Sequence, residues 1–180
     1  MPVVRGKEIN VLFSTEEIAA RNHSMAQAIT ESGLENPLVI SILKGSFVFA
    51  ADLIRALHEV GQSPEVDFIS ISSYGSGTEA KKPVVLRDVE SDVQDRDILL
   101  IDDILESGGT LTFTRDLMIE RGANRVEIAV LLDKTMRRKS AISAKFVGFD
   151  CPDKFVVGYG MDVAHAFRGL PYVGEVVGDA

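Results

Sequence analysis

The chain has 180 residues, of which 46% are hydrophobic and 26% charged, and its formal net charge is −8. A chain of this length favours one domain with a sizeable core, over residues 1–180. The acidic balance argues against a broad nucleic-acid-binding face, which needs clustered Lys and Arg. The sequence has no long apolar run and no signal-like start, so we expect no membrane partner. The one cysteine, Cys151, cannot form an internal disulfide, so we expect a cytoplasmic protein.

The first half of the chain alternates strand and helix patterns. Ser14 and Glu17 form a capping-box pattern that begins a helix. Ser46 follows an apolar strand and is predicted to cap the next helix. The predicted elements are a strand over 9–13, a helix over 14–32, a strand over 38–43, a helix from 46 to about 60, and strands over 66–74 and 84–86.

A polar, glycine-bearing segment, residues 75–83, separates the last two of these strands. Such a composition is typical of a loop without a role. Its place before a second hairpin strand favours an active-site lid instead, with Ser73 and Tyr74 at its base. We expect residues 74–83 to become ordered only when substrate binds.

Residues 97–111 carry the clearest functional pattern of the chain. An apolar Ile and Leu run predicts a strand buried on both faces, which is expected to end at Asp102 and Asp103. Glu106 and a loop of Ser107, Gly108 and Gly109 come next, and a helical pattern starts near Thr110. A strand, a glycine loop and a helix N-terminus together suit a phosphate.

This loop lacks the Gly-Lys-Ser/Thr ending of an ATP- or GTP-binding loop. Carboxylates beside a phosphate cradle suit a sugar phosphate, because they accept hydrogen bonds from ribose hydroxyls or hold hydrated Mg²⁺. An ordinary strand-to-helix turn with a solvated acidic cluster is the alternative interpretation.

The alternation predicts an α/β fold with a mostly parallel sheet flanked by helices. Ligands gather at the carboxyl ends of the strands in such sheets. Another strand is predicted over 126–132, and the core is expected to span about 14–145. After it come short β pieces over 146–149, 155–159 and 173–177, with one or two helical turns over 163–167; together with residues 1–13 they predict a small β-rich hood.

Residues 97–111 closely resemble the motif that binds phosphoribosyl diphosphate (PRPP) in type I phosphoribosyltransferases. The resemblance narrows to the hypoxanthine (-guanine) members of that family and extends from about residue 38 to the C-terminus. The segments that carry it are Lys44-Gly45, Leu132-Asp133-Lys134, the run from Phe149 to Tyr159, Asp162, and Phe167-Arg168.

The resemblance implies Mg²⁺-dependent transfer of phosphoribose from PRPP to N9 of hypoxanthine or guanine, by a homodimer or homotetramer. Glu106 would act on purine N7 as the general base or acid, and Asp162, Asp102 and Asp103 would serve as metal and ribose ligands. The other implied ligands are Ser107, Gly108, Gly109 and Thr110 for the 5′-phosphate, Lys44, Gly45 and Arg168 for the pyrophosphate, and Lys134, Phe155 and Val156 for the purine.

The resemblance also implies that the Lys44–Gly45 peptide bond is, or can become, cis and so aims an amide at the pyrophosphate. The chain departs from the family pattern at Glu106, where Asp is usual, and at Gly109, which is often polar or basic.

Several of these residues also have a purely structural interpretation. Phe155 would then be a core residue, and Lys134 and Arg168 would be solvated surface charges. Arg137 and Arg138 belong to a basic run that reads as a solvated turn, although Arg138 is long enough to reach the pyrophosphate. Alternatives for the whole chain are a phosphoribosyltransferase for another base, and a nucleotide-sensing regulator with weak or no catalysis.

Overall fold

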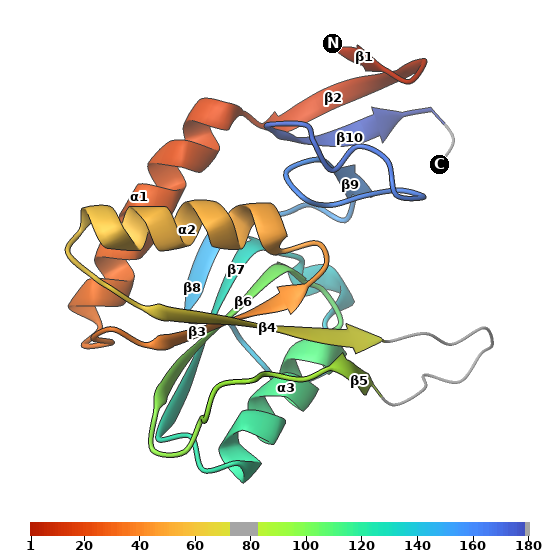
Figure 1. Cartoon of the computed structure of the whole chain (residues 1–180). Coiled ribbons are helices and arrows are strands. Elements are labelled where there is room, and N and C mark those ends of the chain that lie inside the picture. Colours follow the sequence, from red (N-terminus) through yellow and green to blue (C-terminus); the bar gives the residue numbers. More distant parts are fainter. Residues whose placement is uncertain (73–82, 179–180) are drawn as a thin grey trace.

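A computed structural model describes residues 1–72 and 83–178 of the chain (Figure 1). Its helices are α1 (Thr15–Glu31), α2 (Phe47–Glu59) and α3 (Gly109–Glu120). Its strands are β1 (Val3–Val4), β2 (Lys7–Phe13), β3 (Leu38–Leu43), β4 (Glu65–Ser72), β5 (Val84–Arg87), β6 (Asp97–Leu105), β7 (Arg125–Asp133), β8 (Phe146–Asp150), β9 (Val156–Val157) and β10 (Val173–Val177).

The strands form two sheets. The larger has the order β5-β4-β3-β6-β7-β8, and only β5 runs antiparallel to its neighbour. Helices α1 and α2 cover one of its faces and α3 the other, as Figure 1 shows. The smaller sheet has the order β1-β2-β10-β9 and is antiparallel. The predicted fold class, a mostly parallel sheet flanked by helices with a small β-rich hood, is confirmed.

The central strands are buried on both faces because their residues alternate between two apolar clusters. Val39 and Leu99 pack with α1 and α2, whereas Ile40 and Leu100 pack with α3. Successive side chains of a strand point to opposite faces, so a continuous apolar run is what this position in the sheet requires.

The two helix starts predicted from serines differ in outcome. The Ser14 capping box is confirmed, since its hydroxyl accepts from Glu17 N at 3.2 Å and its own amide donates to Glu17 Oε2 at 2.8 Å. Ser46 makes no cap. Its buried hydroxyl donates to Ile42 O at 2.5 Å and lies 2.8 Å from Ser41 Oγ. A helical backbone at Ser46 (φ −73°, ψ −10°) directs the hydroxyl back to the strand.

Strand β6 is longer than expected, and Asp102 and Asp103 lie inside it. Its pairing with β3 ends at Ile101, but its pairing with β7 continues to Leu105. The two carboxylates are therefore on a strand that has lost one neighbour. Residues 146–150 also differ from expectation, because β8 pairs with β7 in the larger sheet rather than in the hood.

The helical turns expected over 163–167 are wrong. Val163 and Ala166 form an isolated antiparallel bridge, and Ala164, His165 and Phe167 have φ values of 48°, 65° and 73°. A positive φ is incompatible with a right-handed helix, so this segment is a tight loop.

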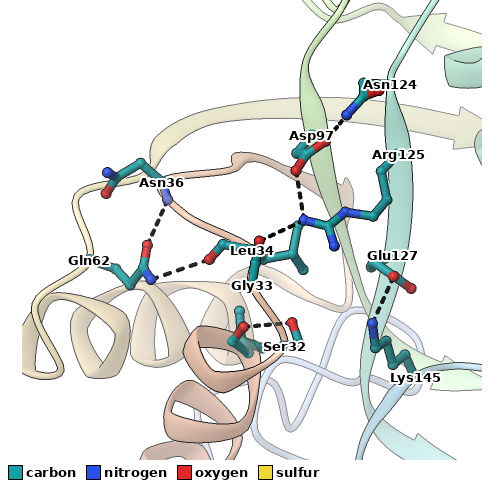
Figure 2. Close-up of polar contacts among 11 residues, drawn as sticks. Ser32, Gly33, Leu34, Asn36, Gln62, Asp97, Asn124, Arg125, Glu127 and Lys145 are labelled. Atoms are coloured by element: carbon teal, nitrogen blue, oxygen red, sulfur yellow. Dashed lines mark hydrogen bonds and ion pairs between the residues drawn. The ribbon is translucent and has the colours of Figure 1, made fainter.

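A polar cluster joins the turn after α1 to the starts of β6 and β7 (Figure 2). One Arg125 nitrogen donates to Gly33 O at 2.8 Å and to Asp97 Oδ2 at 2.7 Å, and Asn124 donates to Asp97 Oδ1 at 2.7 Å. Burial opposes the charge on Asp97, but the hydrogen bonds from Asn124 and Arg125 outweigh it and lower the pKa of Asp97. Gln62 makes further bonds to the same turn.

Candidate active site

Two adjoining cavities open at the carboxyl ends of β3, β6 and β7. The larger, of about 640 Å³, lies between these strand ends and the hood. The smaller, of about 380 Å³, extends along the loop that precedes α3. They share Lys44, Gly45, Asp103 and Glu106, which therefore lie at their junction. This is the edge at which parallel sheets bind ligands.

The loop before α3 and the first turn of α3 line the smaller cavity with all four residues predicted to hold a phosphate. Gly108 has φ 85°, and a Cβ there would lie 2.1 Å from Ser140 Oγ. Glycine is therefore required both for the backbone conformation and for the close packing under the loop. The first amides of α3 have no partner within the helix, as at every helix N-terminus. These residues are Ser107 and Gly108 of the loop, and Gly109 and Thr110 of the first turn of α3.

Asp102 and Asp103 form an acidic pair in which Asp102 is buried and Asp103 partly buried. Asp103 N donates to Asp102 Oδ1 and Ile104 N donates to Asp103 Oδ1, each at 3.0 Å, and the two carboxyl groups also share a hydrogen bond. Burial raises the pKa of both carboxyl groups, and the Asp103 charge raises that of Asp102 further. Neither forms an ion pair with any described residue, so the pair offers oxygen ligands to a cation.

The turn after β3 contains a cis peptide bond at Leu43–Lys44, so the expectation of one at Lys44–Gly45 is wrong by one residue. The glycine is needed for another reason. A Cβ on Gly45 would lie 1.9 Å from Asp103 Oδ2, so only glycine permits this approach of the turn to the acidic pair.

Lys134 and Phe155 are both found in the larger cavity. Lys134 is only 5% exposed, and its Nζ lies 3.7 Å from Glu106 Oε1. The Phe155 residue is 52% exposed, whereas the neighbouring Val156 is buried. The purely structural interpretations of these two residues are therefore wrong, because Lys134 is not a solvated charge and Phe155 is not a core residue.

Arg168 and Asp162 form an ion pair of 2.7 Å on the hood side of the larger cavity. Arg168 also donates to Gly160 O at 2.7 Å. Its side chain is 23% exposed, so it is a partnered group rather than a solvated charge.

The three acids predicted as metal ligands are not gathered into one cluster. Among the described residues, no group of three or more His, Cys, Asp or Glu side chains is arranged to hold a metal ion. Mg²⁺ is usually held by one or two carboxylates together with waters and substrate phosphates. The Asp102–Asp103 pair fits that requirement, and Asp162 lines the larger cavity from the hood side.

Two arginines of the basic turn have contacts that the sequence did not reveal. Arg138 donates to Glu106 O at 3.0 Å and to Ile142 O at 2.8 Å, and it pairs with Asp133. It therefore binds the protein main chain rather than facing the cavity. Arg137 lines the larger cavity and contacts Glu106. The only signal for Arg137 in the sequence is its place three residues after Lys134.

Ser73, Tyr74 and the lid expected over 74–83 lie outside the described residues, except for Pro83. The described neighbours of that segment, Ser72 and Leu86, line the larger cavity.

The chain matches a family model described as phosphoribosyl transferase domain over residues 10–164. It is 46% identical over 169 residues to a hypoxanthine-guanine phosphoribosyltransferase of Staphylococcus epidermidis, covering 93% of each chain. It is 42% identical over 174 residues to the hypoxanthine phosphoribosyltransferase of Escherichia coli, covering 94% of this chain and 96% of the relative.

A solved structure of a hypoxanthine phosphoribosyltransferase from Staphylococcus aureus superimposes with a TM-score of 0.86 at 40% identity, covering 93% of this chain and 90% of the other. A hypoxanthine-guanine phosphoribosyltransferase from Bacillus anthracis superimposes with a TM-score of 0.85 at 38% identity, covering 95% and 99%. The chain therefore belongs to the phosphoribosyltransferase family.

Proposed function

We propose that this chain transfers the phosphoribosyl group of PRPP to N9 of hypoxanthine or guanine and releases pyrophosphate. One observation carries the choice of base. A buried ammonium, that of Lys134, shares a cavity with the exposed ring of Phe155 and the carboxylate of Glu106. A cation beside an aromatic face and a carboxylate suits a 6-oxopurine, which offers a carbonyl oxygen, a π-face and a ring nitrogen.

In this proposal the purine lies against Phe155 and the main chain of Val156. Lys134 donates to the 6-oxo group, for which a flexible ammonium with three donors is suited. Glu106 accepts a hydrogen bond or a proton at N7. Bond formation at N9 develops positive charge on the purine, and the carboxylate stabilises that charge.

The PRPP side of the site is proposed to use the smaller cavity. The amides and hydroxyls from Ser107 to Thr110 bind the 5′-phosphate. Asp102 and Asp103 accept hydrogen bonds from the ribose hydroxyls, and Arg168 with the Lys44–Gly45 turn binds the pyrophosphate. The ribose then lies at the junction of the two cavities, near Glu106 and Gly45, between the purine and the pyrophosphate.

PRPP-using transferases normally require a divalent metal, and we propose Mg²⁺. Asp102 and Asp103 would hold it with oxygens of the substrate, and Asp162 would assist on the pyrophosphate side. When bound, Mg²⁺ stabilises the negative charge of the departing pyrophosphate.

The described residues contain no helix long and apolar enough to cross a membrane. The single cysteine favours the cytoplasm as the proposed compartment. A homodimer or homotetramer remains the proposed assembly, and the acidic charge of −8 disfavours a nucleic-acid partner.

The direct test measures pyrophosphate release with PRPP, Mg²⁺ and a panel of hypoxanthine, guanine, xanthine and uracil. We expect turnover with the first two bases and a strong loss in the Lys134→Gln variant. Efficient turnover of uracil or xanthine alone would contradict the base assignment. Binding of nucleotide without turnover of any base would favour the nucleotide-sensing regulator.

A further inference from the structure

Arg137 connects the Glu106 loop to the hood. It ends the short 3₁₀ turn Thr135–Arg137, which follows β7. Its Nη1 lies 3.4 Å from Glu106 Oε1, and its Nε lies 2.5 Å from Asp153 Oδ1. Asp153 is two residues before Phe155. The Arg137 guanidinium therefore joins the Glu106 carboxylate to the segment that carries the Phe155 ring.

Glu106 has two cationic neighbours, and both approach the same oxygen. Lys134 Nζ is 3.7 Å from Glu106 Oε1 and Arg137 Nη1 is 3.4 Å from it. In the proposed function, Lys134 donates to the purine 6-oxo group when base is bound. Arg137 is then the cation that stays on Glu106 while this carboxylate acts at N7.

The guanidinium is suited to this bridge because its donors point along fixed directions and can bind two carboxylates at once. An ammonium at the same place would bind one carboxylate or the other. The Arg137 side chain is 58% exposed, and exposed ion pairs contribute little to stability. The contact therefore matters for the position of Glu106 rather than for folding.

The adjacent arginine has a different set of contacts. Arg138 is 17% exposed at its side chain and binds the main-chain oxygens of Leu105, Glu106 and Ile142. Arg138 thus holds the backbone of the Glu106 loop, whereas Arg137 holds the Glu106 side chain.

We propose that Arg137 is a positioning residue for the transfer reaction. It fixes the Glu106 carboxylate toward the purine and couples it to Asp153, so that the Glu106 loop and the Phe155 segment adopt their base-binding positions together. This inference rests on the proposed function, because it concerns how Glu106 acts on the purine.

The test compares Arg137→Gln and Arg137→Lys with the matched control Lys139→Gln, in wild-type and Glu106→Gln backgrounds. Lys139 is an exposed cation of the same turn, and its side chain forms no hydrogen bond or ion pair with a described residue. We expect Arg137→Gln to lower kcat with hypoxanthine by about 10- to 100-fold, because a misplaced catalytic group has costs of this order. KM for PRPP should change as little as in Lys139→Gln, and Arg137→Lys should recover part of kcat.

The kcat of the double variant distinguishes a positioning role of Arg137 from a merely structural one. In the Glu106→Gln background, Arg137→Gln should cause no further loss of kcat, since a residue that acts through Glu106 has nothing left to position. Losses that multiply would overturn the inference, as would a kcat for Arg137→Gln equal to that of Lys139→Gln.

Asp153→Asn tests the second half of the bridge. We expect it to raise KM for hypoxanthine and to lower kcat less than Arg137→Gln does. It also keeps the inference testable if Arg137→Gln fails to fold. If the Asp153→Asn variant had wild-type KM and kcat, the proposed coupling of Glu106 to the hood would be wrong. Absence of turnover in the wild-type protein would instead refute the proposed function itself.

Discussion

Gly45 and Asp103 lie so close that a Cβ on residue 45 would be 1.9 Å from Asp103 Oδ2. The same turn also approaches the hood, where a Cβ on Gly160 would lie 2.3 Å from Gly45 O. The turn after β3 therefore lies close to both the Asp103 carboxylate and the hood backbone, and glycine at positions 45 and 160 permits the two approaches.

The first prediction concerns this meeting point. Gly45→Ala should displace the Asp103 carboxylate, because the two cannot occupy their present positions together. We expect kcat/KM for PRPP to fall by about 10- to 100-fold. Steady-state kinetics and thermal unfolding would be measured in parallel. The matched control is Gly169→Ala, where a Cβ meets nothing within 4 Å; equal kinetics in the two variants would contradict the prediction.

The second prediction concerns Glu106. Glu106→Gln keeps the shape of the side chain and removes its charge, so kcat should fall by about 10²- to 10⁴-fold. PRPP affinity should hardly change, because the phosphate loop is untouched. Glu106→Asp should be intermediate, since its charge is correct and its reach is shorter. Wild-type kcat in Glu106→Gln would leave Glu106 as a solvated loop acid.

The third prediction separates binding from stability at Phe155. Because Phe155 is 52% exposed, Phe155→Leu should change the melting temperature little. Base stacking on an aromatic side chain contributes about 1–3 kcal/mol. KM for hypoxanthine should therefore rise by roughly 5- to 150-fold, while Phe155→Tyr should retain most of the affinity. A loss of stability without a change in KM would show that the ring packs rather than binds.

The fourth prediction follows from the acidic pair. Burial and the Asp103 charge raise the pKa of Asp102. The folded protein then holds the Asp102 proton more tightly than the unfolded chain does. The free energy of unfolding therefore decreases as pH rises from the unfolded pKa, about 3.9, through the native pKa.

Asp102→Asn removes this dependence. In the presence of a chelator, we expect the variant to melt at a higher temperature than the wild type at pH 8 and at nearly the same temperature at pH 3. Each kcal/mol of relieved desolvation corresponds to about 2–4 °C for a chain of this size. Its kcat/KM for PRPP should be strongly reduced. A lower melting temperature at pH 8 would show that the Asp102 charge stabilises the metal-free fold.

Local patterns predicted much of this structure. The strand over 38–43 matches β3 because an uninterrupted apolar run is required where both faces are covered. The Ser14 capping box was predictable because its partners are three residues apart. The loop before α3 was predictable because its glycines and hydroxyls are contiguous in the chain.

Features set by distant segments were harder to predict. The end of β6 depends on how far β7 continues beside it, which the sequence of β6 does not encode. The place of β8 in the larger sheet depends on the same neighbour. Arg137 and Arg138 are adjacent and chemically identical, yet one faces the cavity and the other binds the main chain. The direction of a long side chain depends on which partners the fold brings near.

The Arg125–Asp97–Gly33 cluster of Figure 2 lies at the starts of β6 and β7, whereas the two cavities lie at their ends. Asp102 is the first β6 residue that lines a cavity, and it lies five residues beyond Asp97, a rise of about 16 Å. Substitutions that alter base preference near Lys134 or Phe155 and substitutions that strengthen this cluster share no contacts, so their effects should add. A stabilising change at one end of the sheet raises the tolerance of the chain to mutation. Evolution or engineering can then change the substrate range at the other end.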